Sequence, residues 1–300
     1  MITSAAAIAT KVGFVGTGVM GAPMALNLAR RFEVVAWNRT PDRLQPLIDA
    51  GVTIVGDVAD VFAECEVVLL MLANGQVIDQ VLGRGTPQFG SLVNGHTIVP
   101  MGTTAPSYSA GLEKDVLAAG GSYVEAPVSG SRQPAHDGTL VAMLAGDAEP
   151  VNTVRPLLEP MCRQSFVCGP VPAGLTMKLA VNLYLITLVT ALAETAEYAE
   201  RHGLDLAVLR DVLDAGPMAS DVSRGKLAKL VADDFSVQAR LADVRYNTDL
   251  IAELARSSDT ATPLLDISRE LFLEAEALGH EGLDMLGVIH AVAARSDPPQ

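Results

Sequence analysis

The strongest constraint on the fold is an alternation of two patterns through the first 172 residues. Short runs rich in β-branched residues are separated by stretches with helical periodicity, which is the pattern of βα units. The runs that predict strands are Val12–Val15, Glu33–Trp37, Thr53–Val55, Val67–Leu72, Thr97–Met101, Tyr123–Ala126, Leu140–Leu144 and Phe166–Val167. Strands spaced by helices predict a parallel, doubly wound sheet. The strands after Tyr123 follow one another more closely, so we expect antiparallel pairing at one edge.

The helical stretches of this part are Met20–Arg31, Leu44–Ala50, Val58–Cys65, Val77–Leu82 and Tyr108–Ala118. Past Pro172 the pattern changes, and helical periodicity dominates to the end of the chain. The helices predicted there are Ala173–His202, Leu206–Ala215, Val222–Val231, Asp243–Ser257, Pro263–Leu278 and Asp284–Ala293. The first is far longer than the mean helix of ~11–12 residues, which suits a helix that leads from one domain into the next. We therefore expect an α/β domain over residues 1–172 and an all-α domain over residues 173–300.

A glycine motif follows the first predicted strand. Gly16, Gly18 and Gly21 form G-x-G-x-x-G, with Val19 and Met20 between the last two. The first glycine allows a tight turn, the second lets the backbone approach a pyrophosphate, and the third allows close packing of helix on strand. The motif alone is weak, but its place between the first strand and the first helix is the required context. It predicts a Rossmann-type dinucleotide-binding domain.

The end of the second predicted strand bears on which dinucleotide is bound. NAD sites usually have an acidic residue there that holds the ribose hydroxyls. This sequence has Asn38, Arg39 and Thr40 instead. The guanidinium group of Arg39 suits a 2′-phosphate, and Asn38 and Thr40 can add neutral hydrogen bonds. We expect NADP(H) to be preferred over NAD(H), unless Arg39 is simply a solvated residue after a strand.

Two polar residues interrupt the apolar start of the long predicted helix. Lys178 and Asn182 are four residues apart and so share one helix face. Burying an ammonium group is costly without a partner, so the lysine needs a reason. As a functional residue, Lys178 could give a proton to a carbonyl oxygen, with Asn182 orienting the substrate or the lysine. The alternative is a lysine whose stem packs while its head reaches water.

Composition narrows the classes of function. The formal net charge is −14, which argues against binding to nucleic acid or to an anionic membrane surface. The three cysteines cannot all pair within the chain, and Met1–Thr10 has no signal-peptide pattern, so we expect a cytoplasmic protein. The longest apolar run, Leu183–Ala193, is shorter than the ~20 residues of a membrane span. The hydrophobic fraction of 49% predicts extra burial between subunits.

Other catalytic chemistries find little support. The five histidines form no H-E-x-x-H and no zinc-binding spacing with cysteine, so we expect no metal site. Ser129 lies outside any G-x-S-x-G elbow.

Several separated motifs together resemble the β-hydroxyacid dehydrogenase family, over most of the chain. The sequence Val12–Ala25 is similar to the family's cofactor signature, and Glu125–Gly130 with Asp137–Leu140 is similar to its substrate loop. Met177–Leu179 with Asn182 is similar to its catalytic helix. The loop from Glu125 to Ser131, followed by a basic residue, is closer to the glyoxylate/succinic semialdehyde reductase branch than to the 3-hydroxyisobutyrate branch.

The resemblance implies a role for each matching residue. Lys178 would be the general acid/base, and Asn182 would help place the substrate. The remaining substrate-binding candidates are Ser129 and Gly130, which would hold a carboxylate, with Ser131, Arg132, Phe235 and Asp243. Thr103 would lie near the nicotinamide, and Met71 and Leu72 are further cofactor-binding candidates. Arg132 either pairs with a second carboxylate of the substrate or is a solvated loop arginine.

Four positions depart from the family pattern. They are Ala242, where many members have a lysine before the aspartate, Gly102, where a serine often precedes Thr103, Pro100, where an aspartate is common, and Pro172, which replaces a glycine. Ala242 removes a positive charge near the expected cofactor or substrate. The resemblance therefore implies the family's type of reaction more strongly than it implies a particular substrate.

The expected activity is NADPH-dependent reduction of the carbonyl group of a small carboxylic acid, a semialdehyde or a 2- or 3-oxo acid. An imine reductase is one alternative, although those enzymes usually have an aspartate or tyrosine at the position of Lys178. A non-catalytic dinucleotide-binding protein is another. The apolar segment Leu183–Ala193 predicts a homodimer or higher assembly, since such a face invites aggregation in a monomer.

Overall fold

The computed structural model describes residues 11–297, so the predicted absence of a signal peptide in Met1–Thr10 lies outside the described residues. The chain divides into two compact units, Met1–Lys178 and Leu179–Gln300. The division falls within the long helix α9 (Ala173–Arg201), so the first turn of that helix belongs with the sheet. The predicted domain boundary lay just before this helix, at Pro172.

The first unit is built on a nine-stranded sheet of order β3-β2-β1-β4-β5-β6-β8-β7, with β9 also paired to β8. The strands are β1 (Lys11–Val15), β2 (Glu33–Trp37), β3 (Thr53–Ile54), β4 (Val67–Leu70), β5 (Thr97–Pro100), β6 (Ser122–Glu125), β7 (Val128–Ser129), β8 (Leu140–Gly146) and β9 (Cys162–Gly169). The pairs from β3 to β6 are parallel, while β6 and β7 pair antiparallel with β8, as expected. The order of the chain reverses between β1 and β4, where doubly wound sheets bind ligands.

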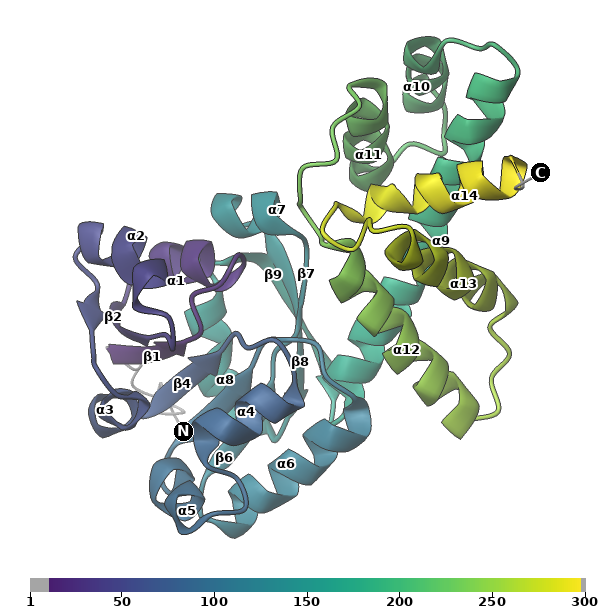
Figure 1. The fold of residues 1–300 in the computed structure, drawn as a ribbon. Helices are drawn as coiled ribbons and strands as arrows, with labels where there is room; N and C mark the ends of the chain where they lie inside the picture. The colour runs from purple at the N-terminus through teal and green to yellow at the C-terminus, as the bar shows by residue number, and fades with distance from the viewer. Residues whose placement is uncertain (1–10, 298–300) are drawn as a thin grey trace, which may run out of the picture. The chain divides into compact units, whose positions relative to one another are not determined.

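The helices of this unit are α1 (Gly21–Ala29), α2 (Gln45–Asp49), α3 (Val58–Glu64), α4 (Gly75–Leu82), α5 (Pro87–Val93), α6 (Pro106–Ala118), α7 (Arg132–Asp137) and α8 (Ala148–Val154). Short 3-10 segments cover Pro41–Leu44 and Arg155–Leu158. Helices cover both faces of the sheet (Figure 1). Their side chains and those of the strands form two separate cores. Alternation along the strands feeds both cores: Phe14 of β1 faces the core that contains α1, and its neighbour Val15 faces the core that contains α3.

Four short elements were absent from the predictions. They are α5, α7, α8 and β7, none of which exceeds seven residues. Strand β9 extends well beyond the predicted Phe166–Val167, because its pairing with β8 continues along most of both strands. Its outward side chains are largely exposed, so its sequence lacks the continuous apolar run that marked the central strands.

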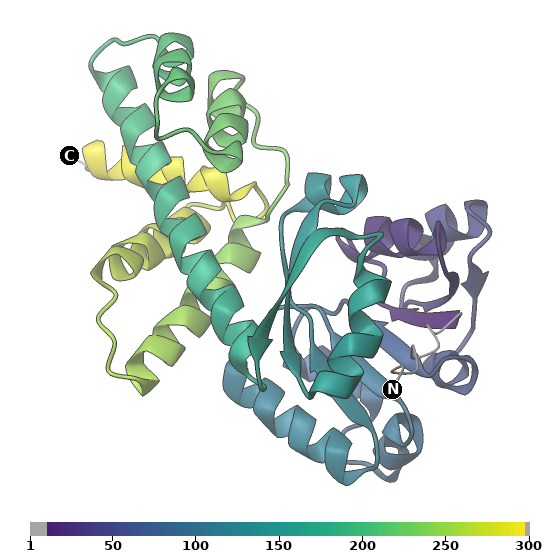
Figure 2. The ribbon, with the colours of Figure 1, turned by 180° about the vertical axis from the view of Figure 1, so that it is seen from behind.

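The second unit is helical. Besides the main part of α9, it contains α10 (Leu206–Ala215), α11 (Asp221–Val231), α12 (Leu241–Ser257), α13 (Pro263–Ala277), a 3-10 turn (Met285–Gly287) and α14 (Val288–Ser296). Figure 2 shows α9 as the long helix of this unit, with α14 crossing it. Local capping defines several ends: the Asp205 side chain accepts the N–H of Ala207 at the start of α10, and Ser220 forms a capping box with Ser223 at the start of α11.

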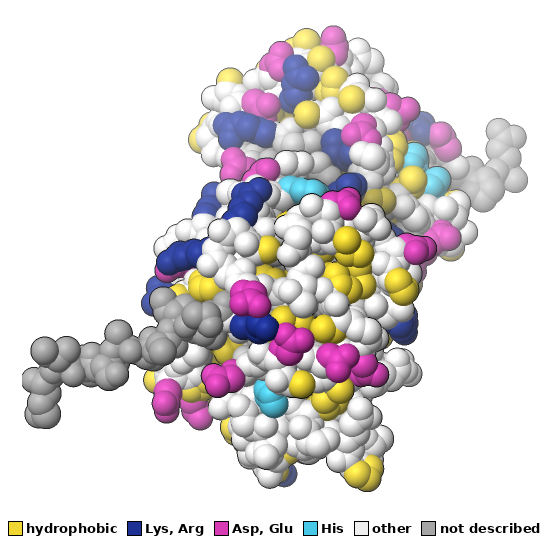
Figure 3. All heavy atoms as spheres, turned by 90° about the vertical axis from the view of Figure 1, so that its left-hand side faces the viewer, with side chains coloured by type: hydrophobic (Ala, Val, Ile, Leu, Met, Phe, Trp, Pro, Cys, Tyr) yellow, Lys and Arg dark blue, Asp and Glu magenta, His cyan; other side chains and the backbone are white. Residues whose placement is uncertain are grey.

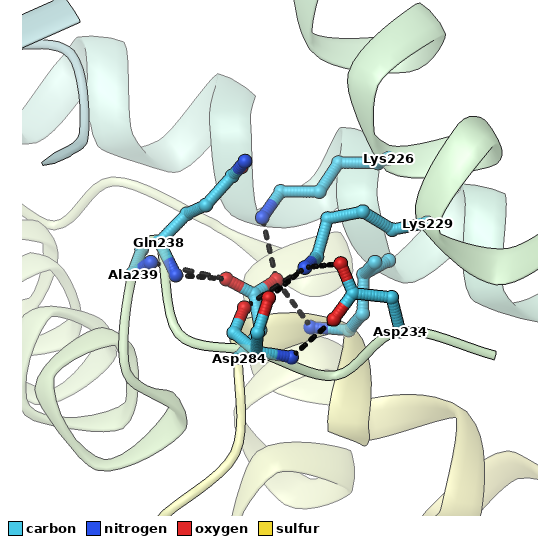
Figure 4. A network of polar contacts seen from close by, with 8 residues as sticks. Lys226, Lys229, Asp234, Gln238, Ala239 and Asp284 are labelled. Atoms are coloured by element: carbon cyan, nitrogen blue, oxygen red, sulfur yellow. Dashed lines mark hydrogen bonds and ion pairs between the residues drawn. The ribbon is translucent and has the colours of Figure 1, made fainter. Parts of the chain in front are cut away.

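A buried polar network fixes the loop between α11 and α12 (Figure 4). The Lys226 ammonium donates to Oδ1 of Asp284 at 2.5 Å, and both side chains are buried. Oδ2 of Asp284 accepts the backbone N–H groups of Gln238 and Ala239, each at 3.0 Å. Lys229 holds the same loop by donating to Asp234 at 2.8 Å. The loop is therefore pinned by charged hydrogen bonds to two helical segments.

The length and hydropathy of α9 would suffice to cross a membrane, although the apolar run Leu183–Ala193 had seemed too short. In the structure, 44% of its most apolar window is buried against the rest of the chain. On the face in Figure 3, several basic side chains gather toward the upper left of the lower body, and acidic side chains are scattered over the rest of the surface.

Candidate functional site

The turn between β1 and α1 has a glycine wherever the backbone must come close. Gly16 has φ +96°, and a Cβ there would overlap the carbonyl oxygen of Met71. A Cβ on Gly21 would overlap the carbonyl oxygen of Gly16, so α1 packs directly on the turn. Gly18 differs, because the atom nearest to its Cβ position is Nη1 of Arg43, 3.8 Å away. Open space above Gly18 and free N–H groups at the start of α1 fit a pyrophosphate.

The loops after β4 and β5 adjoin this turn. The side chain of Leu72 comes within 2.9 Å of a Cβ built on Gly16, which brings the predicted cofactor residues Met71 and Leu72 to the glycine turn. A Cβ on Gly102 would lie 2.5 Å from the carbonyl oxygen of Leu72. Gly102 therefore lets the two loops touch, and the departure noted in the sequence has a steric reason. Thr103, which follows Gly102 in the chain, is half-buried beside this contact between the loops after β4 and β5.

Residues at the end of β2 complete the predicted cofactor site. Oδ1 of Asn38 accepts the N–H of Thr17 at 3.1 Å, and its amide group donates to the carbonyl oxygen of Thr40 at 2.8 Å. Asn38 thus ties the second strand to the glycine turn through its side chain. Arg39 and Thr40 are exposed. Arg43, which the sequence analysis did not single out, is also exposed and lies near Gly18.

The predicted substrate loop lies between β7 and α7. Ser129 is the last residue of β7 and is paired with Val141 of β8. Gly130 has φ +128°, which side chains rarely adopt, and a Cβ there would lie 2.6 Å from Leu140. Ser131 precedes α7 and is partly buried, whereas Arg132 in its first turn is exposed. The motif is therefore a sharp turn whose glycine is required by the backbone.

A buried asparagine joins this loop to the cofactor helix. Asn27 lies on α1 and is 1% exposed. Its amide nitrogen donates to the carbonyl oxygens of Ala135 at 2.8 Å and of His136 at 3.1 Å, both in α7. The helix that follows the glycine turn and the helix that follows the predicted substrate loop are thus joined by a buried side chain. The sequence offered no signal for this pairing, because the partners are backbone groups more than a hundred residues away.

Lys178 is buried, with 7% of its surface exposed. Burial lowers the pKa of its ammonium group from 10.5 to about 8. Asn182, one turn further along α9, is 4% exposed. The helical spacing predicted from the sequence is therefore present, and the Lys178 side chain is largely buried along its length. An amine with a pKa near neutral pH can both give and take a proton.

The remaining candidates lie in the helical unit. Asp243 is exposed in the first turn of α12. Phe235 packs against His290 with ring centroids 5.0 Å apart, in the wall of a pocket of about 160 Å³. The pocket is also lined by Glu197, Glu200 and Asp233. Three acidic side chains would repel a carboxylate, so this pocket does not suit a carboxylic acid. Among the described residues, no cluster of histidine, cysteine and carboxylate side chains could hold a metal ion.

Two family models together match most of the chain. A model of the NAD binding domain of 6-phosphogluconate dehydrogenase matches residues 11–169, which contain the glycine turn and the substrate loop. A second model, described as the NAD-binding domain of NADP-dependent 3-hydroxyisobutyrate dehydrogenase, matches residues 172–292.

Individual relatives match along nearly the whole chain. Glyoxylate/succinic semialdehyde reductase 1 of Arabidopsis thaliana is 30% identical over 283 residues, which cover 94% of this chain and 98% of the relative. The chloroplastic reductase 2 of the same plant is 32% identical over 285 residues, covering 94% and 79%. The crystal structure of Mycobacterium tuberculosis 3-hydroxyisobutyrate dehydrogenase with L-serine has a TM-score of 0.83 at 25% identity, covering 94% of this chain and 99% of that one. The chain thus belongs to the β-hydroxyacid dehydrogenase family, whose members use a nicotinamide dinucleotide.

Proposed function

We propose that this protein reduces the carbonyl group of a small carboxylic acid, a semialdehyde or a 2- or 3-oxo acid, to the hydroxyacid with NADPH. The observation that carries the proposal is Lys178, a buried amine on the family's catalytic helix whose pKa lies near 8. The names of the two plant reductases support this substrate class. The expected small-molecule substrate, homo-oligomeric state and cytoplasmic location belong to the same proposal.

Lys178 would hold the proton that the substrate oxygen needs. A bound nicotinamide dinucleotide would supply the hydride for the carbonyl carbon. Lys178 would give its proton to the carbonyl oxygen, so that the product is an alcohol, and would regain a proton from solvent before the next turnover. Asn182, on the same face of α9, would donate a hydrogen bond that orients the substrate or the lysine. Ser129 and the backbone at Gly130 would bind the carboxylate.

Two arginines support a preference for NADPH. The end of β2 offers Arg39, and the following turn offers Arg43, whose guanidinium group lies near the open backbone of Gly18. Both are exposed and therefore free to meet a 2′-phosphate in a bidentate manner. Asn38 contributes indirectly, since its side chain is used to fix the turn.

Steady-state assays with a substrate panel test the proposal. The panel contains glyoxylate, succinic semialdehyde, branched oxo acids and a cyclic imine, each with NADPH and with NADH. We expect turnover of one of the carbonyl acids with NADPH, and a loss of ~10²–10⁴-fold in kcat for Lys178→Met. Turnover of the imine alone would make the protein an imine reductase. Binding of NADPH without turnover of any compound, or near wild-type rates for Lys178→Met, would contradict the proposed mechanism.

A further inference from the structure

The first turn of α9 is held by a residue fifty positions earlier in the chain. A helix start leaves N–H groups without partners in the helix. Two of them are satisfied locally: Ala173 donates to the carbonyl oxygen of Pro170 at 2.8 Å, and Thr176 donates to that of Pro172 at 3.0 Å. The N–H of Leu175 instead donates to Oε2 of Glu125 at 3.1 Å. The side chain that caps this helix therefore comes from the sheet.

Glu125 is the last residue of β6 and is completely buried. Burial raises the pKa of its carboxyl group above the ordinary value, and the hydrogen bonds it accepts act in the opposite direction. Its second oxygen, Oε1, is buried and has no hydrogen-bond partner within residues 11–297. Keeping a carboxyl group in such a place costs free energy. An apolar residue could fill this space but could not accept the N–H of Leu175, so the carboxyl group is what holds the start of α9.

The packing around this contact leaves no freedom. A Cβ on Gly174 would lie 2.8 Å from the carbonyl oxygen of Met143 and 2.9 Å from Oε2 of Glu125. The backbone of α9 therefore touches both β8 and the Glu125 carboxyl group. The hydroxyl groups of Ser109 on α6 and Tyr123 on β6 share a buried hydrogen bond of 2.7 Å. Ser109 also acts on the Glu125 carboxyl group, where it opposes the rise in pKa that burial causes. The start of α9 is thus wedged against the sheet.

Lys178 follows Leu175 by three residues, which places it about one turn further along the same side of α9. Any tilt or shift of the first turn would move the Lys178 side chain with it. We propose that Glu125 is a positioning residue for the reaction, because it holds the first turn of α9 and thereby sets the place of Lys178. This inference rests on the proposed function of Lys178, and it gives Glu125, the first residue of the predicted substrate loop, a role other than binding substrate.

The variants Glu125→Ala and Glu125→Gln separate positioning from simple packing. Alanine removes the acceptor, whereas glutamine has the same shape and keeps one oxygen for the N–H of Leu175. The matched control is Glu149→Ala, which removes an exposed acidic residue from the first turn of α8. Circular dichroism and thermal unfolding establish that each variant is folded. If the alanine variant does not fold, Glu125→Asp is used instead. Its side chain is one methylene shorter, so the carboxylate is drawn away from the N–H of Leu175.

The first readout is the pKa of Lys178 itself, which does not depend on any catalytic role. The chain has only five lysines, so reductive methylation with isotope-labelled methyl groups gives few NMR signals, and Lys178→Met identifies the relevant one. In Glu125→Ala, a displaced Lys178 meets water, and we expect its pKa to rise from near 8 toward the ordinary value of ~10.4. The glutamine variant and the Glu149→Ala control should keep the wild-type value.

The second readout is whether the substitution changes kcat or KM for NADPH. A misplaced acid lowers kcat by about 10–100-fold while KM for NADPH stays the same, and glutamine should restore most of kcat. The proposal is overturned if the variant that lacks the acceptor keeps both the wild-type pKa of Lys178 and kcat within about twofold. Activity that survives Lys178→Met would instead end the proposed function, and the NMR titration would still judge Glu125.

Discussion

Replacing Lys178 with methionine should make the protein more stable while it destroys activity. Methionine keeps most of the length of lysine and its unbranched apolar shape, but it has no charge to bury. Burial lowers the Lys178 pKa from 10.5 to about 8. That difference corresponds to about 3 kcal/mol of unfavourable interaction for the ammonium form in the folded state. At pH 7 the variant should therefore gain about 3 kcal/mol in free energy of unfolding.

The pH dependence of this gain has a definite sign. Below pH 8, Lys178 is protonated in both the folded and unfolded states, so the full cost of burial is present. Between pH 8 and 10.5 the unfolded state binds more protons than the folded state, so wild-type stability rises relative to the variant as pH rises. Near pH 10.5 most of the electrostatic difference should be gone, and the two proteins should differ mainly in how the lysine and methionine side chains pack.

Urea unfolding of both proteins at pH 7 and at pH 10.5 measures the difference. Subtracting the two curves at each pH removes the contributions of the other titrating groups, among them Tyr108, whose pKa burial also raises. Loss of stability in Lys178→Met at pH 7, or a gain of equal size at both pH values, would refute the reasoning.

Three further predictions concern the cofactor, the helical core and the assembly. Arg39→Ala should weaken NADPH binding about tenfold, for the loss of one charge-assisted contact, and leave NADH binding nearly unchanged by fluorescence titration. Equal effects on both cofactors would remove Arg39 from the 2′-phosphate site. Asp284→Asn should lower the free energy of unfolding in urea by about 3–5 kcal/mol, because it leaves the buried Lys226 ammonium without its charge partner. A loss under ~1 kcal/mol would show that the ion pair is dispensable. Val208 and Val212 are 58% and 64% exposed, which makes this face of α10 a candidate subunit interface. Val208→Glu should therefore shift a homo-oligomer toward monomer, as measured by light scattering. An unchanged mass would place the interface elsewhere.

The sequence predicted the features that local patterns determine. Buried parallel strands are continuous apolar runs, and Gly16, Gly18 and Gly21 after one of them correctly predicted a tight turn from strand to helix. Lys178 and Asn182 were recognisable because polar residues stand out in an apolar helix. The long helix α9 was found almost to the residue, since no proline or glycine interrupts it after its first turn.

What the sequence could not predict depends on contacts between distant residues. The cap that Glu125 provides to α9 joins residues fifty positions apart, and no local motif records it. The link from Asn27 to α7 uses backbone acceptors, which every residue has. Arg43 was missed because it lies past the end of β2, in a 3-10 turn that returns it to the glycine turn. Sequence patterns locate elements, whereas these pairings arise only when the elements pack.

The pH dependence of kcat for carbonyl reduction at saturating NADPH tests the central claim most directly. If Lys178 gives the proton, the rate should be constant below about pH 7 and fall about tenfold per pH unit well above the Lys178 pKa of about 8. The same limb should vanish in Lys178→Met, which should turn over slowly at every pH. A wild-type rate that stays flat to pH 10, or an alkaline limb that survives in the variant, would contradict the account.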